Sequence, residues 1–174
     1  GGVFIYCKSL NSITISANSI EEYCQSSINN LLYRNGYNLP RKLVIAGQEI
    51  TDLVIPCTVK TINDGVFNGL TFNSVVITAN SMEEYCQSAI NPLLYSKGID
   101  LPRKLVIAGQ EMTDLVIPCT LKDINNKDVF KGMNFTTVTL SANSIEEYCQ
   151  STVNQLLYSN GIDLPRKLVI AGKE

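Results

Sequence analysis

Hydrophobic residues recur along the chain with two periodicities, one of three to four residues and one of two residues. The first periodicity is clearest at Ile20, Cys24, Ile28 and Leu31, with Tyr23 alongside. This spacing places the side chains on one face of a helix. We therefore predict a helical segment here and in the two later stretches of similar sequence.

Each predicted helix is preceded by a serine that is followed three residues later by a glutamate. The pairs are Ser19 with Glu22, Ser81 with Glu84, and Ser144 with Glu147. In a capping box of this spacing, each side chain bonds the free backbone N–H of the other residue. We expect helices to begin there, to run to about Asn29, Asn91 and Asn154, and to be followed by a short second turn. Pro92 should stand at the first position of that turn, because a proline inside a helix loses a hydrogen bond.

The two-residue periodicity and the many β-branched residues predict strands at residues 42–46 and 51–56. Equivalent points of the two runs lie ten residues apart, too few for a parallel crossover, so we predict an antiparallel hairpin. Its register stays open. A two-residue loop opposes Leu43 to Asp52, whereas a three-residue loop, which we prefer, opposes Leu43 to Leu53.

A further strand is predicted at residues 74–78. Ile77 lies 22 residues after Ile55, a separation that suits one coil returning to the same sheet. The whole pattern repeats with a period of about 62 residues. We divide the chain, a single repeat domain over residues 1–174, into a partial unit at 1–16, units at 17–78 and 79–141, and a partial unit at 142–174. Because both ends fall inside a unit, we expect either a piece of a longer array or ends that pair with another molecule.

The amino-acid composition argues against several kinds of function. The chain has 174 residues, of which 45% are hydrophobic, and no histidine, which removes histidine-based catalysis and histidine-containing metal sites. Its 14 Lys and Arg against 16 Asp and Glu leave no basic stripe for nucleic acid, and no apolar run is long enough for membrane insertion. We predict no enzyme activity, no cofactor, no nucleic-acid partner and no insertion into a membrane.

The six cysteines are Cys7, Cys24, Cys57, Cys86, Cys119 and Cys149. Equivalent cysteines of neighbouring units should lie roughly 10 Å or more apart if each unit stacks at least two strand layers. That separation exceeds the approximately 7 Å that a disulfide spans between Cα atoms. We predict reduced, buried thiols and leave open a pairing between the two cysteine classes inside a unit. No two cysteines fall within four residues of each other, so we predict no metal site.

Adjacent glutamates recur where the helices should begin: Glu21 and Glu22, Glu83 and Glu84, Glu146 and Glu147. A catalytic carboxylate pair needs two distinct environments, whereas these pairs recur identically. Acidic residues in a first helical turn also interact favourably with the helix dipole. We therefore assign the glutamates a structural role.

A basic pair precedes each hairpin: Arg41 and Lys42, Arg103 and Lys104, Arg166 and Lys167. One interpretation is a basic ladder that binds acidic glycans or a carboxylate-rich partner. The other, which we favour, is a solvated strand end that pairs with Asp52 and Asp114 across the hairpin, since exposed ion pairs contribute little.

A second candidate surface follows from the alternation at residues 74–78. If Val75 and Ile77 point into the core, the residues between them point outward. Nine residues of three strands share this position: Ser12, Thr14, Ser16, Ser74, Val76, Thr78, Thr137, Thr139 and Ser141. Short side chains on a rigid sheet lose little entropy on binding and suit extended, multivalent contact. The alternative is a sheet face that is merely soluble.

Between residues 53 and 77 the chain carries Leu-Val-Ile-Pro at 53–56, Val59, Ile62, Gly-Val-Phe at 65–67 and Ser-Val-Val-Ile at 74–77. This succession resembles the BspA-like, or treponemal-type, leucine-rich repeat, and residues 3–15 are similar to the same module. The helical segment is an insertion relative to that pattern, and Val3, Val66 and Val129 replace its usual alanine. The resemblance implies an α/β leucine-rich-repeat solenoid with β-hairpins and short helices inserted in each unit. It also implies a secreted or cell-surface protein used for adhesion.

The leading hypothesis is a non-enzymatic binding or adhesion module, secreted or at a cell surface. It would contact a protein or glycan on another cell or in the matrix through its exposed sheet face. The alternative is a structural spacer or a self-assembling stalk segment, in which copies form a homo-oligomer by edge-to-edge pairing of unfinished repeat ends.

Overall fold

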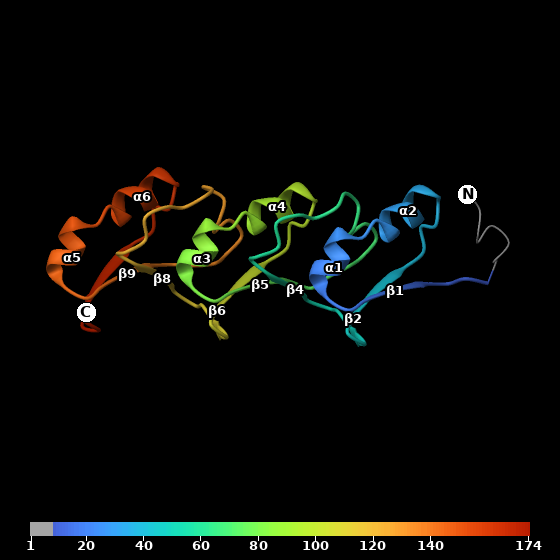
Figure 1. Ribbon diagram of the computed structural model, residues 1–174, viewed down its shortest axis with the longest axis horizontal. Helices are drawn as coiled ribbons and strands as arrows, with labels where there is room; N and C mark the ends of the chain where they lie inside the picture. Colours follow the sequence, from blue (N-terminus) through green and yellow to red (C-terminus); the bar gives the residue numbers. More distant parts are fainter. Residues whose placement is uncertain (1–8) are drawn as a thin grey trace.

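The computed structural model describes residues 9–174 and shows a mixed α/β chain that extends along one axis (Figure 1). Its helices are α1 (Ile20–Gln25), α2 (Ile28–Arg34), α3 (Met82–Gln87), α4 (Ile90–Ser96), α5 (Ile145–Gln150) and α6 (Val153–Ser159). Its strands are β1 (Ile13–Ala17), β2 (Arg41–Ile45), β3 (Gln48–Glu49), β4 (Leu53–Pro56), β5 (Val75–Ala79), β6 (Arg103–Ile107), β7 (Gln110–Glu111), β8 (Leu115–Pro118), β9 (Val138–Ala142) and β10 (Arg166–Ile170). The helix pairs follow one another along one side of the molecule and the strands along the other (Figure 1).

Over the described residues the strands form separate sheets, with the orders β1-β2-β3, β4-β5-β6-β7 and β10-β9-β8. β4 and β5 pair in parallel, so the coil between them returns to the same sheet as predicted. β5 and β6 also pair in parallel, and α3 and α4 lie in the connection between them. The same pairing recurs for β8, β9 and β10. Parallel strands need such long connections, and both kinds of connection in this chain supply them.

The predicted antiparallel hairpin between residues 42–46 and 51–56 is wrong. β2 pairs in parallel with β1 and then turns back through a two-residue loop into the short β3. β4 leaves this sheet and pairs with β5, where Leu53 and Ile55 are fully buried. The ten-residue separation did exclude a parallel crossover between the two runs, but each run finds its parallel partner elsewhere in the chain.

The predicted helix starts and their serine caps are confirmed at all three first helices, whereas the predicted bond from the serine N–H to the glutamate is not formed. The backbone N–H of Glu22 donates to Ser19 Oγ at 3.1 Å, and the equivalent bonds recur at Ser81 and Ser144. The glutamate reaches one residue further back than predicted, because Glu22 Oε2 accepts from the backbone N–H of Asn18 at 3.0 Å.

The break between the paired helices comes earlier than predicted, at Ser26 in the first unit instead of after Asn29. Ser26 Oγ accepts from the backbone N–H of Ile28 at 3.2 Å, and this local bond competes with continuation of the helix. Pro92 is the third residue of α4, not the first. It is tolerated there because the N–H groups of a first helical turn have no partner within the helix.

One cluster of buried hydrophobic residues contains side chains from all three sheets and from the helix pairs. In β4 and β5, Leu53, Ile55, Val75 and Ile77 are fully buried, as the two-residue periodicity predicts. The units therefore share their interior, which makes the packing of one unit dependent on its neighbour.

A tyrosine and an asparagine on each of the first two helix pairs hold the next coil in place. Tyr23 Oη donates to Val66 O at 2.6 Å. Asn29 Nδ2 donates to Val66 O at 2.6 Å and to Asn68 O at 2.9 Å. Tyr85 and Asn91 make the equivalent bonds to residues 128–131. We call the tyrosine and asparagine together the coil clamp.

Candidate functional site: the exposed face of the sheets

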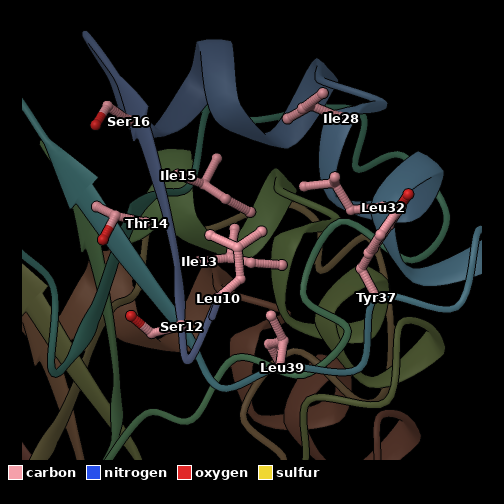
Figure 2. A pocket seen from close by; sticks show the side chains of 10 residues that line it. All are labelled: Leu10, Ser12, Ile13, Thr14, Ile15, Ser16, Ile28, Leu32, Tyr37 and Leu39. Atoms are coloured by element: carbon pink, nitrogen blue, oxygen red, sulfur yellow. The ribbon is translucent and has the colours of Figure 1, made fainter. Parts of the chain in front are cut away.

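The strip residues in and beside β1 and those within β5 and β9 alternate with core residues, as predicted. Figure 2 shows Ser12, Thr14 and Ser16 on one side of β1, while Ile13 and Ile15 point to the other side. In β5 and β9 the alternation continues, with buried residues between half-buried ones. The outward side of β1, β5 and β9 therefore forms an exposed face of the sheets.

The neighbouring strands add residues to the strip in fixed rows. Val76 lies between Val54 and Lys104, and Thr78 lies between Pro56 and Val106. In the third sheet the corresponding rows are Val116, Thr139 and Lys167, and Pro118, Ser141 and Val169. In the first sheet Thr14 lies beside Lys42 and Ser16 beside Val44. We call these the sheet-face rows, and each of them contains apolar or basic side chains as well as small ones.

Two exposed valines on this face were not predicted. Val54 is 49% exposed and Val116 is 37% exposed. The strand prediction at 51–56 contained the necessary signal, because Leu53 and Ile55 alternate with Val54.

Ser74 differs from the rest of the strip. Its Oγ donates a hydrogen bond to Asp52 Oδ1 at 2.7 Å. Asp52 therefore pairs with Ser74 and not, as the sequence had suggested, with the basic residues.

The six residues of the basic ladder do not lie together. Arg41 is 8% exposed and Arg103 is 5% exposed, and both point to the core side of the strand, whereas Lys42 and Lys104 point outward. The ladder as predicted is therefore wrong for its arginines. Adjacent residues of a strand face opposite sides, so Arg103 shares the inward side with Leu105 and cannot share a face with Lys104.

The arginines close the loop between helix and strand. The Arg103 guanidinium carbon lies 3.8 Å from the centre of the Tyr95 ring, and that of Arg166 lies 3.9 Å from the Tyr158 ring. Arg103 Nη1 donates to Leu101 O at 2.7 Å and Nη2 to Ile99 O at 2.6 Å. Burial lowers the pKa of Arg103. These contacts explain the residue type, because arginine combines stacking with several donors.

The outward lysines pair with glutamates of the short hairpin strand and of the segment after Ala171. The Nζ–Oε distances are 3.0 Å for Lys42 with Glu49, 3.2 Å for Lys104 with Glu111 and 3.1 Å for Lys167 with Glu174. The pairs are about half exposed and contribute little to stability. They do cancel the positive charge of the face locally, and the predicted partners Asp52 and Asp114 are not involved.

The cysteines of the described residues are free thiols. Cys24, Cys57, Cys86 and Cys119 are buried, as predicted, whereas Cys149 is exposed. Burial raises the pKa of Cys24 and Cys86 to about 12, and burial with the nearby Glu84 raises that of Cys57 to about 11. Thiols with such pKa values are poor nucleophiles at neutral pH. Cys7 lies outside the described residues.

The glutamates contact the helix starts. Glu22, Glu84 and Glu147 accept from the backbone N–H of the residue before each capping serine, and Glu21, Glu83 and Glu146 lie in the first turns. Within residues 9–174, no three Cys, Asp or Glu side chains come together as a metal site would require. The helices of this part of the chain are too short to cross a bilayer.

An apolar cavity of about 420 Å³ lies beside β1 and α2 (Figure 2). Leu10, Ile13 and Leu32 are among the side chains that line it. Val75 and Ile77 of β5, which correspond to Ile13 and Ile15 of its strand wall, are fully buried against β4. The cavity offers no convergent polar groups for chemistry.

In comparisons with known proteins, no family model, curated protein or solved structure matched this chain.

Proposed function

We propose that this chain is a non-enzymatic binding module of the leucine-rich-repeat type, secreted or at a cell surface, and that its sheet-face rows contact the partner. The solenoid interpretation is supported by parallel strands that return to the same sheet and by an interior that neighbouring units share. The outward rows on three successive sheets are the observation that carries the proposal.

A protein partner fits the rows better than a glycan does. The rows consist of valine, proline, serine, threonine and lysine, and none of these offers the aromatic ring on which a sugar stacks. Each lysine is already paired with a glutamate, so an acidic glycan would have to compete with an existing ion pair. The exposed Val54 and Val116 provide small apolar contacts that recur from one sheet to the next.

The test is a binding screen of the immobilised chain against purified matrix proteins and a glycan array, at low and high salt. We expect a protein partner whose affinity changes little with salt, since the face has no unpaired lysine in its rows. A double variant, Val54→Asp with Val116→Asp, should weaken binding by at least about tenfold. Thr61→Asp, at an exposed position of the coil outside the rows, is the matched control.

Equal binding by the double variant and by the control would remove the sheet face from the proposal. Binding only to acidic glycans, lost at high salt, would favour the lysines as the contact and contradict the protein partner.

A second function, a structural spacer, is supported by the shared interior, because such packing makes the molecule stiff along its axis. Sedimentation over a range of concentrations separates the two. Growth of the particle with concentration favours assembly, whereas a monomer that binds a protein through the sheet face favours the binding module.

A further inference from the structure

Each of the two coils faces the turn that follows the next helix pair. We call the contact of residues 64–72 with residues 97–101 the first junction, and that of residues 127–135 with residues 160–164 the second junction. The two junctions occupy equivalent positions of the repeat, and both sides of each belong to the described residues. They can therefore be compared residue by residue.

An ion pair closes the first junction. Lys97 Nζ donates to Asp64 Oδ1, and the side chain of Lys97 is only 21% exposed. The equivalent residues of the second junction are Asn160 and Lys127. The second coil therefore carries a positive charge where the first carries a negative one, and the turn opposite it has lost its cation.

The aromatic side chains of the two junctions differ in exposure. Phe67 and Phe72 of the first junction are each 6% exposed. Their equivalents Phe130 and Phe135 are half-buried, although the rings keep the same edge-on packing with centres 6.3 Å apart. The second junction thus presents aromatic surface that the first junction covers.

A cavity of about 320 Å³ lies at the second junction, between the coil and the turn after α6. Small-molecule sites in proteins have volumes of about 300–1,000 Å³, so the cavity is at the lower end of that range. Most of its lining is apolar and comes from both sides of the junction and from β8: Leu115, Phe130, Met133, Phe135, Ile162 and Leu164. The size and the lining suit one small ligand with an apolar body.

Three charged residues also line the cavity: Lys127, Lys131 and Asp163. All three are exposed, and over residues 9–174 none of them makes an ion pair. Lys131 Nζ lies 4.5 Å from the centre of the Tyr95 ring, a contact that leaves its charge without a carboxylate. Since the lysines outnumber the carboxylate, the potential at the cavity favours an anion.

We propose that the cavity of the second junction binds a small organic anion in which a carboxylate is attached to an aromatic ring. The ring would pack on Phe130 and Phe135, because edge and offset contacts between rings are favourable. The carboxylate would accept from Lys127 and Lys131. This site lies between a coil and a helix pair, apart from the sheet-face rows, and does not rest on the function proposed for them.

The probe is 2-naphthoate, titrated into the isotope-labelled 174-residue chain and followed by NMR. We expect saturable changes at Phe130, Phe135 and Ile162 with a Kd of about 0.1–1 mM. The neutral 2-naphthamide, which has the same shape, should bind about threefold more weakly because it lacks the charge. Added salt should reduce the difference between the two ligands.

Variants of the coil test the lysine. Lys127→Gln should weaken naphthoate binding by about threefold to tenfold, since it removes one charge-assisted contact. Lys122→Gln, at an exposed position of the same coil outside the cavity, is the matched control. The double variant Lys127→Asp with Asn160→Lys introduces the ion-paired residues of the first junction and should abolish detectable binding. Urea unfolding checks that each variant is folded.

Equal binding of naphthoate and naphthamide, unchanged by Lys127→Gln, would overturn the proposal. So would the absence of saturable binding, or changes confined to the cavity beside β1. Tighter binding of the cation 2-naphthylmethylamine, lost in Asp163→Asn, would assign the cavity to a cation and also overturn the proposal.

Discussion

The helix pairs α3–α4 and α5–α6 are nearly the same sequence in two different surroundings. A coil covers the first pair, so that Tyr85, Cys86 and Asn91 are fully buried. The second pair has no such cover among the described residues, and its equivalents Tyr148 and Cys149 are exposed or half-buried. Helix starts, caps and bounds are the same in both. Local sequence therefore determines the helices, whereas the neighbouring coil determines what their side chains do.

The largest difference should appear in cysteine reactivity. Burial raises the pKa of the Cys86 thiol to about 12, so at pH 8 only about one molecule in ten thousand carries the thiolate that reacts. An ordinary cysteine with a pKa of about 8.5 ionises roughly a thousand times more at this pH. We expect iodoacetamide to modify the exposed Cys149 and to leave Cys86 unmodified, as measured by mass spectrometry of the separate tryptic peptides. While the chain stays folded, each unit of pH below about 12 should raise the thiolate fraction of Cys86, and with it the labelling rate, about tenfold. Similar rates at the two residues would contradict the comparison.

Removal of the clamp tyrosine should have the next largest effect. Tyr85 is fully buried and its hydroxyl bonds Val129 O, so Tyr85→Ala should lower the free energy of unfolding by about 3–5 kcal/mol. Tyr148→Ala removes a half-buried side chain without a hydrogen bond and should cost about 1 kcal/mol or less. Urea unfolding of the two variants measures the difference. Equal losses would mean that the coil adds nothing to the tyrosine at α3.

The clamp asparagine should show the same asymmetry at a smaller scale. Asn91 Nδ2 donates to Asp128 O, Val129 O and Lys131 O at 2.8–3.0 Å. Asn91→Ala leaves these carbonyls unpaired inside the molecule and should cost about 2 kcal/mol. Asn154→Ala should change stability by less than about 0.5 kcal/mol. Urea unfolding of the two variants measures this difference, and equal losses would contradict it.

The contrast also explains which features the sequence could predict. Capping boxes, the Pro92 break and strand alternation depend on residues within about four positions of one another, and these predictions came close to the structure. The orientation of the nine strip residues follows from alternation alone. The helix break at Ser26 was misplaced because a local serine bond competes with the helix, which spacing of apolar residues does not reveal.

Features that depend on a distant partner were missed. β2 and β4 looked like a hairpin in the sequence because they are adjacent, yet each pairs with a strand more than twenty residues away. Arg41 and Lys42 were treated as one basic unit, although Arg41 stacks near Tyr33 and Lys42 faces solvent. The clamp residue Asn29 gave no signal, since its acceptors lie near residue 66. Burial of a polar side chain becomes intelligible only when its partner is known.

The hairpin tips offer the smallest effect and a control for the whole comparison, because they lie outside the helix pairs. Ala108 and Ala171 have φ of 49° and 48°, in the left-handed region that alanine disfavours, and a Cβ on the following Gly109 or Gly172 would meet nothing within 4 Å. Asparagine before glycine is the favoured pair for a tight two-residue turn. Ala108→Asn and Ala171→Asn should each raise the free energy of unfolding by about 0.5–1 kcal/mol, measured by urea unfolding, and by similar amounts. A gain at Ala108 without one at Ala171 would show that the environment of the helix pairs extends to the tips. Equal gains would confine the effect of the neighbouring coil to the helices that it covers.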